Sequence, residues 1–455
     1  MECVQELKAS TNPARPISNS LARRIVFIDC RGDQSPRSAG GPLAKVCGLP
    51  IVVRTLLVLE RAGLACAYLL VDREHRARVA SALAGYPRLR ISPEIVESEG
   101  DSLAPVVRAL AEWPPDAQVL VWPAALSLGR QTPEWGEVPP SRMWVGQNAA
   151  SGRDSGMVLT TVEVLRKHPD LAVPVLAERL AVEGKLQRVP LPEGAVIVVD
   201  RAAARLAERA LLRSLRKNTD GVVAKFDRNV SLAISRHLMA LPIKPNHVTA
   251  VAALVGLSCG FLVAHGGYAW MLLGAIAFQL NSILDGIDGE IARAKLLESR
   301  RGQWLDTLSD DLSNLAFILG VSVGSYRTWG EPAYLVLGAV AGVGFFISSA
   351  IMYHYLITHT HTGDLNDFVM PWNQGRAHGL DRSGPRPRPV SRLLARAQWV
   401  FRRDTYVFLC TLFGVVGQLR FMVWLFTIGT TACWMSILLY RALVPPLAGQ
   451  GSEGA

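Results

Sequence analysis

Six apolar stretches occupy the C-terminal half of this chain, and we expect each to cross a lipid bilayer, which takes about 20 residues. They centre on 247–265, 268–287, 306–325, 332–356, 404–419 and 421–442. Several contain polar residues, so we expect an all-α bundle of six transmembrane helices with a hydrated interior. Half of the chain is apolar and 19% is charged, which fits a soluble part joined to a membrane part.

Basic residues between the apolar stretches predict how the bundle is oriented. They gather on one side, at Lys244, Arg293, Lys295, Arg300, Arg301, the arginine-rich segment 376–403 and Arg441. By the positive-inside rule this side is cytoplasmic, so both termini are predicted to lie in the cytoplasm. We therefore attribute the net charge of +10 to basic residues that lie beside the lipid bilayer, and we expect no nucleic-acid partner.

The remaining chain divides into segments of different composition. Residues 23–201 alternate short apolar strands with amphipathic helices, which predicts an α/β domain with a mainly parallel sheet. Residues 202–243 are basic and amphipathic, and we interpret them as juxtamembrane helices, with a solvated connector as the alternative. The membrane domain is then 244–445, between flexible tails at 1–22 and 446–455.

Four aspartates lie at the predicted cytoplasmic ends of the second and third spans. Asp285 and Asp288 are three residues apart, and Asp306 and Asp310 are four apart, so each pair shares one face of a helix. Unpaired carboxylates at a membrane are costly and need a cation or a functional role. Facing carboxylates are the ligands that Mg²⁺ or Mn²⁺ prefers, so the spacing predicts a divalent metal site.

The residues around the aspartates suit phosphate binding. Gly289 and Gly302 lack side chains, so phosphate groups can approach the backbone closely. Arg293 can hold a phosphate oxygen in a bidentate contact. Together with Ala292, these residues form the pattern D-x2-D-G-x2-A-R-x8-G-x3-D-x3-D between Asp285 and Asp310.

This pattern resembles the signature of the CDP-alcohol phosphotransferase (CDP-alcohol phosphatidyltransferase) family at all eight fixed positions. The segment 214–249, which contains Lys244-Pro-Asn246-His-Val-Thr249, is similar to the start of the first span in archaeal-type di-myo-inositol phosphate phosphate synthases. The resemblance covers about 203–443 and implies a multi-pass protein of a prokaryotic inner membrane, paired as a homodimer.

The resemblance also implies a transferase mechanism. Two Mg²⁺ or Mn²⁺ ions would be held by Asp285, Asp288 and Asp306, with Asp310 as a further ligand and as the general base. An alcohol or sugar-phosphate acceptor would attack the phosphorus of a CDP-alcohol donor, and CMP would leave. The implied donor-phosphate residues are Asn246, Thr249, Gly289, Ala292, Arg293 and Gly302. Arg301 and Arg403 could bind an acceptor phosphate, with membrane-edge anchors as the alternative.

The front domain resembles sugar nucleotidyltransferases through Arg24–Asp29 and Gly41–Ile51. It departs from them where catalysis occurs: the loop Cys30–Arg37 lacks their G-x-G-x-R form, and Gly41 occupies their lysine position. Trp122-Pro-Ala stands where a metal-binding aspartate is expected, and Asp200 could match a second one. Without these groups nucleotidyl transfer has little electrostatic support, so we expect a degenerate, inactive module.

Three alternatives remain open from the residues. The acceptor could be inositol-phosphate-like or a phospholipid precursor. The front domain could still make the CDP-alcohol, which would give a bifunctional enzyme. The aspartates could instead form the ion pathway of a membrane transporter, although their position at the cytoplasmic end, away from the bilayer midplane, argues against it.

Overall fold

The computed structural model describes residues 24–31, 41–64, 66–98, 100–130, 135–149, 151–215, 222–361, 363 and 403–443. The predicted tails and most of the arginine-rich segment lie outside these residues. The chain divides into two compact units, Met1–Arg216 with Ala294–Leu296, and Lys217–Arg293 with Leu297–Ala455. Each unit is described by itself.

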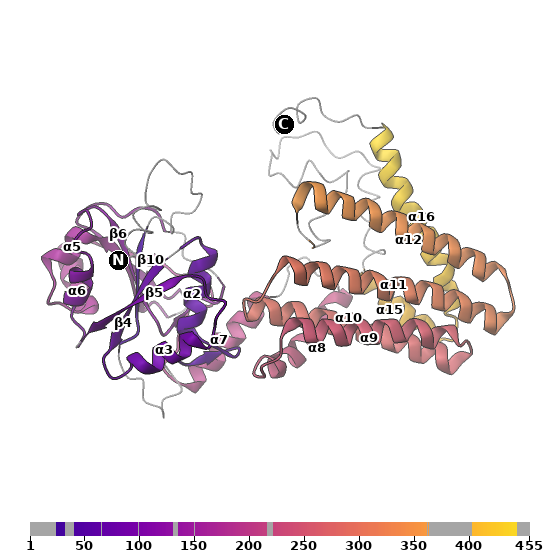
Figure 1. Ribbon diagram of the computed structural model, residues 1–455, viewed down its shortest axis with the longest axis horizontal. Helices are drawn as coiled ribbons and strands as arrows, with labels where there is room; N and C mark the ends of the chain where they lie inside the picture. The colour runs from indigo at the N-terminus through magenta and orange to yellow at the C-terminus, as the bar shows by residue number, and fades with distance from the viewer. Residues whose placement is uncertain are drawn as a thin grey trace. The chain divides into compact units, whose positions relative to one another are not determined.

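A seven-stranded sheet forms the centre of the first unit (Figure 1), in the order β10-β8-β9-β6-β1-β4-β5. Its strands are β1 (Ile25–Asp29), β4 (Cys66–Asp72), β5 (Ser92–Ser98), β6 (Gln118–Pro123), β8 (Met143–Gln147), β9 (Asp154–Thr161) and β10 (Leu186–Pro190). β1 pairs in parallel with β4 and β6, β4 with β5, and β10 with β8. β9 runs antiparallel to β6 and β8. The predicted α/β domain with a mainly parallel sheet is confirmed.

Helices lie on both faces of this sheet, so its central strands β1, β4 and β6 are buried on both sides. The helices of this unit are α2 (Ile51–Arg61), α3 (Arg76–Ala84), α4 (Ala104–Ala109), α5 (Val162–Lys167), α6 (Val173–Val182) and α7 (Arg201–Ser214). Two short ribbons join β2 (Lys45–Val46) to β3 (Leu49–Pro50) and β7 (Leu126–Ser127) to β11 (Val196–Ile197). β1 shows the double burial: Val26 and Ile28 belong to one apolar cluster, and Ile25 and Phe27 to the other.

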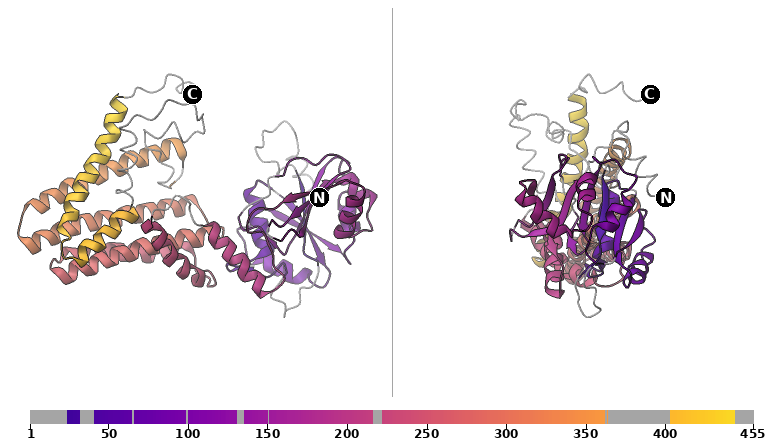
Figure 2. Two further views of the ribbon diagram at one scale, coloured as in Figure 1. Left: turned by 180° about the vertical axis from the view of Figure 1, so that it is seen from behind. Right: turned by 90° about the vertical axis from the view of Figure 1, so that its left-hand side faces the viewer.

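The second unit is helical (Figures 1 and 2). Its described elements are α8 (Val222–Leu238), α9 (Pro245–Ala264), α10 (Tyr268–Ala294), α11 (Arg300–Trp329), α12 (Ala333–Tyr355), the π-helical turn η2 (Leu356–Thr360), α15 (Arg403–Val415) and α16 (Arg420–Leu443). All six predicted apolar stretches are therefore helical. Within the described residues, four helices are long and apolar enough to cross a membrane: α9, α10, α12 continued by η2, and α16. α11 and α15 fall outside that group.

The predicted juxtamembrane segment is divided between the two units. α7 belongs to the first unit and α8 to the second. α8 packs in the helical unit through a polar contact, since the Gln279 side-chain amide of α10 donates to Asp227 Oδ1 of α8 at 2.9 Å. Burial raises the pKa of Asp227 to about 6, with the charge of Asp404 acting in the same direction.

Glycines bring α9 and α11 unusually close. A Cβ atom added at Gly320 of α11 would lie 2.2 Å from the Gly260 carbonyl oxygen of α9. One at Gly324 would lie 2.0 Å from the Val263 carbonyl oxygen. Small residues permit such close helix contacts inside membranes. This crossing fixes α11, which carries Asp306, against α9, which carries Thr249.

Candidate active site

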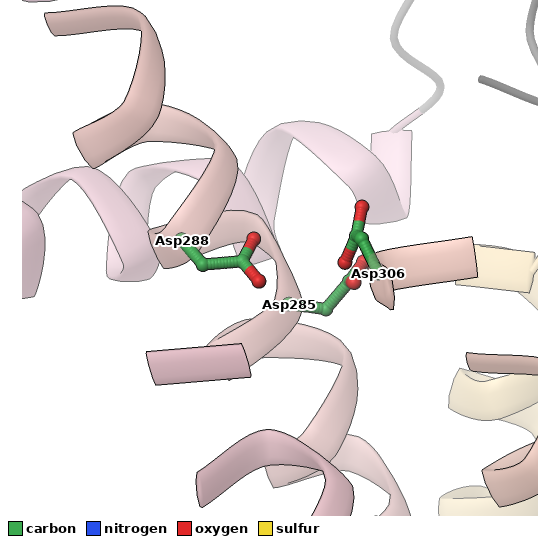
Figure 3. A group of neighbouring side chains, drawn as sticks. All are labelled: Asp285, Asp288 and Asp306. Carbon is green, nitrogen blue, oxygen red and sulfur yellow. The ribbon is translucent and has the colours of Figure 1, made fainter. Parts of the chain in front are cut away.

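Three aspartate side chains meet between α10 and α11 (Figure 3). One oxygen from each of Asp285, Asp288 and Asp306 lies within 4.8 Å of the others. Asp288 is buried, and the other two are half-buried. Three converging carboxylates form a hard, oxygen-only donor set of the kind that Mg²⁺ or Mn²⁺ prefers. We refer to Asp285, Asp288 and Asp306 as the aspartate triad.

The start of α9 supports the triad from one side. Thr249 is buried, and its hydroxyl donates a hydrogen bond to Asp288 Oδ2 while also lying 3.3 Å from the Pro245 carbonyl oxygen. The sequence predicts Thr249 as a nucleotide-binding residue, and the structure places it directly behind a predicted metal ligand. Hydrogen-bond partners of this kind orient a ligating carboxylate.

Asp310 lies one turn beyond Asp306 on α11 and pairs with a cation. The Arg403 guanidinium, from the first residue of α15, contacts Asp310 and also donates to Asp285 Oδ2 at 2.9 Å. Its other terminal nitrogen donates to Asn281 Oδ1 at 2.9 Å. Arg403 thus joins α10, α11 and α15 and balances part of the negative charge of the four aspartates.

A cavity of about 410 Å³ opens beside the triad, and we call it the donor cavity. It is bordered by all six residues that the sequence predicts for donor-phosphate binding, namely Asn246, Thr249, Gly289, Ala292, Arg293 and Gly302. Arg301 is exposed and does not border this cavity. The structure therefore brings together the predicted metal and phosphate residues and leaves Arg301 outside.

Neighbouring side chains leave little room for a Cβ atom at either signature glycine. A Cβ atom at Gly289 would lie 3.1 Å from Arg293 Nη1, so the arginine side chain covers this position. Gly302 N donates to the Ser299 hydroxyl at 3.1 Å, where Ser299 caps the N-terminus of α11. Ser299 borders the donor cavity as well. Sequence reasoning missed Ser299, although a serine three residues before a glycine at a helix start is a capping signal.

A second cavity, of about 290 Å³, lies on the other side of Asp310 among α10, α11, α12, α15 and α16, and we call it the apolar cavity. Asp310 and Arg403 border it, and the triad residues do not. Its large side chains are mainly apolar, namely Phe278, Ile318, Phe345, Met352, Leu425 and Phe426, and polar groups come from Asp311, Asn314, Ser348, Ser349, Tyr406 and Thr430. Asp310 thus borders a cavity that the triad does not reach.

Sequence reasoning also missed a buried carboxylate beside the signature. The Glu290 side chain of α10 is fully buried. The Ser231 and Ser235 hydroxyls of α8 each donate to it at 2.6 Å, and Arg228 Nη1 lies 3.2 Å from its Oε1 atom. An acidic residue directly after Gly289, three residues beyond the second predicted span, was the available signal.

An arginine side chain lies at the carboxyl end of β1 in the first unit. Arg31, whose side chain is 3% exposed, donates from Nε to Asp29 Oδ1 at 2.9 Å and from Nη1 to the Ser102 carbonyl oxygen at 2.7 Å. Gly41 has a φ of 83°, a conformation that a lysine adopts only with strain. Asp200 caps α7 by accepting from Ala203 N at 2.7 Å, which is a structural role.

Comparison with known proteins finds similarity over parts of the chain. Residues 243–371 match the CDP-alcohol phosphatidyltransferase family. A Thermococcus kodakarensis protein named bifunctional IPC transferase and DIPP synthase is 34% identical over 140 residues, 30% of this chain and 31% of that protein. The protein of the same name from Rubrobacter xylanophilus is 28% identical over 325 residues, 62% of this chain and 73% of that one. The chain thus spans less than a third of the length of the first relative.

A shorter relative and two solved structures complete the comparison. An archaetidylinositol phosphate synthase from Pyrococcus horikoshii is 29% identical over 107 residues, 23% of this chain and 55% of that protein. The inositol-1-phosphate CTP transferase from T. maritima gives a TM-score of 0.31 at 11% identity, covering 41% of this chain and 96% of that one. A 4-diphosphocytidyl-2C-methyl-D-erythritol synthase from Anaerococcus prevotii gives 0.30 at 10% identity, covering 41% and 96%.

Proposed function

We propose that this chain, which contains a CDP-alcohol phosphatidyltransferase domain, transfers a phospho-alcohol group from a CDP-alcohol to an acceptor hydroxyl and releases CMP. One observation carries the proposal: the triad carboxylates converge beside a cavity bordered by Arg293 and the other predicted phosphate residues. A transporter needs no such arrangement of phosphate-binding groups next to its acidic residues.

The donor set fits divalent ions. The triad offers three carboxylates whose oxygens lie within 4.8 Å of one another, and Asp310 lies on the next turn of α11. We assign Asp285, Asp288 and Asp306 as ligands for two Mg²⁺ or Mn²⁺ ions, with Asp310 as a further ligand. When bound, such ions neutralise charge on the attacking and leaving oxygens of a phosphoryl transfer.

The chain's own residues supply the proton transfer and the orientation. Asp310 takes the proton of the acceptor hydroxyl, because it faces the apolar cavity and lies beside the triad. The acceptor oxygen then forms a bond to the phosphorus that bears the alcohol, and the bond from that phosphorus to the bridging oxygen breaks. CMP leaves with that oxygen, while Arg293 holds a donor phosphate and Arg403 stabilises the negative charge around Asp310.

The apolar cavity favours an acceptor alcohol with an apolar portion. Asp310, Asp311 and Arg403 give this cavity a charged part. Its apolar part is formed by Phe278, Ile318, Phe345, Met352, Leu425 and Phe426. An inositol phosphate would place some of its hydroxyls against that apolar part, where they have no polar partners. The names of the relatives nevertheless include inositol phosphate products, so both acceptor classes belong in the test.

For the first unit we propose that nucleotidyl transfer has been lost. The buried Arg31 guanidinium occupies the carboxyl end of β1, where α/β sheets bind their ligands. If instead the chain were bifunctional, the full-length Asp306→Asn variant would still release pyrophosphate from CTP and an alcohol phosphate. We expect no pyrophosphate from that variant or from wild type.

We also propose a homodimer in a prokaryotic inner membrane, as the family resemblance implies. Both termini would lie in the cytoplasm, an orientation that rests on the basic residues between the spans. Cysteine substitutions at Ser18 and Ser452 would then react with a membrane-impermeant maleimide only after the membrane is opened. Labelling of either position in intact cells would contradict this orientation.

The activity test uses the purified full-length chain with Mg²⁺, a panel of CDP-alcohols, and inositol phosphate or a lipid alcohol as acceptor. Wild type should release CMP with at least one pair, and Asp310→Asn should lose this activity. Asp170→Asn, at an exposed position of the first unit, is the matched control and should behave as wild type. If no donor gives CMP release that depends on Asp310, the proposal fails.

A further inference from the structure

A polar contact between α8 and α10 lies at the edge of the donor cavity. Glu290 is fully buried, and its two carboxylate oxygens accept hydrogen bonds from Ser231 and Ser235 at 2.6 Å each. The guanidinium of Arg228, one turn before Ser231 on α8, lies 3.2 Å from the same carboxylate. The Arg228 side chain, 18% exposed, borders the donor cavity.

The placement of Glu290 separates it from the predicted metal ligands. It stands one helical turn after Gly286, where an added Cβ atom would touch Ser231 at 3.4 Å, so Gly286 and Glu290 form the face of α10 that meets α8. Asp288, two residues earlier, points to the opposite side of the helix. Glu290 is therefore a poor candidate for a metal ligand.

Burying a carboxylate is costly unless it is paired and hydrogen-bonded. Here two hydroxyls and one guanidinium donate to the Glu290 carboxylate and offset the free-energy cost of its burial, and all three come from α8. A leucine at this position would pack α8 against α10 without the cost. What the carboxylate adds is a fixed orientation for Arg228 at the cavity.

We propose that Arg228 binds a phosphate of the CDP-alcohol donor and that Glu290 is the positioning residue that holds it there. The inference rests on the proposed function and adds a second arginine to the donor cavity beside Arg293. Both the diphosphate and the aspartates are negative, so additional cations at the cavity favour donor binding. Guanidinium groups match phosphate oxygens in bidentate geometry, which a lysine does not reproduce.

The test measures CDP binding and donor kinetics of the full-length chain in detergent with Mg²⁺. Arg228→Gln should weaken CDP binding and raise the donor KM by about 10- to 100-fold, the range for one charge-assisted hydrogen bond. Glu290→Gln, which keeps the size of the side chain, should raise the donor KM by about 3- to 10-fold with little change in kcat. The acceptor KM should stay unchanged in both variants.

Two controls keep the result decisive. Arg236→Gln, at an exposed arginine on the same helix, should leave CDP binding unchanged. If Arg228→Gln does not fold, Arg228→Lys serves in its place, and it should still bind CDP more weakly than wild type. Wild-type CDP affinity in Glu290→Gln and in the folded Arg228 variant would overturn the inference. CDP binding without any CMP release in wild type would refute the proposed reaction and leave the Arg228 measurement valid.

Discussion

The close crossing of α9 and α11 predicts that one added methyl group disturbs the active site from a distance. In Gly320→Ala the new Cβ atom would lie 2.2 Å from the Gly260 carbonyl oxygen, and real Cβ contacts do not fall below 3.0 Å. The obstacle is backbone, so no side-chain rotation relieves it and the two helices must separate. Overpacking of this kind costs about 1–3 kcal/mol of stability.

The separation should also reduce activity. Gly320 lies on the same helix as Asp306, at a distance of about 21 Å along the axis. A rigid helix transmits the shift to the triad, and misplacement of reacting groups by about 1 Å can cost 100-fold in rate. We expect Gly320→Ala to lower the Tm in detergent and to reduce CMP release by about 10- to 100-fold.

Gly342→Ala is the matched control, because the same change in α12 would meet only the ends of leucine side chains, Leu319 Cδ2 at 3.3 Å and Leu315 Cδ1 at 3.7 Å. These ends can rotate away, so this variant should keep nearly wild-type Tm and activity. Equal Tm and equal CMP release in the two variants would refute the reasoning about the crossing.

Three further changes test other parts of the structure. Thr249→Val removes the hydrogen bond to Asp288 and should lower the apparent Mg²⁺ affinity in the CMP-release assay by about 10-fold. Unchanged Mg²⁺ dependence would show that Thr249 does not affect metal binding. Because the pKa of Asp227 is raised to about 6, wild type loses stability as the pH rises from about 4 to 6. Asp227→Asn should therefore be more stable than wild type by about 1–3 kcal/mol at pH 7.5 and similar to it at pH 4. A higher wild-type Tm at pH 7.5 would contradict this sign. Met352→Trp fills the apolar cavity and should raise the KM of a lipid acceptor without changing the donor KM; equal acceptor KM values would show that acceptors bind elsewhere.

Local patterns predicted much of the fold and of the triad. The alternation of apolar strands and helices identified the α/β unit, and the spacing of Asp285, Asp288 and Asp306 placed them on facing helix surfaces, because such periodicity depends only on nearby residues. The antiparallel β9 was not predicted, since the direction of a strand is set by the loops and partners around it.

Contacts between distant residues were beyond sequence reasoning. Arg403 was named as a possible acceptor residue, and its contacts with Asp310 and Asp285 join positions 93 and 118 residues apart. The pair of Arg228 and Glu290 spans 62 residues. The apolar cavity is formed by five helices, so no single segment of the sequence indicates that it exists.

The most direct test of the central claim follows the phosphorus that bears the alcohol. A CDP-alcohol labelled at that phosphorus is incubated with the full-length chain, Mg²⁺ and the acceptor found in the activity screen. We predict that the label appears in the acceptor product in equal amount to the CMP released, and that Asp306→Asn forms neither. Label recovered as free alcohol phosphate, or full transfer by Asp306→Asn, would contradict phospho-alcohol transfer at the aspartate triad.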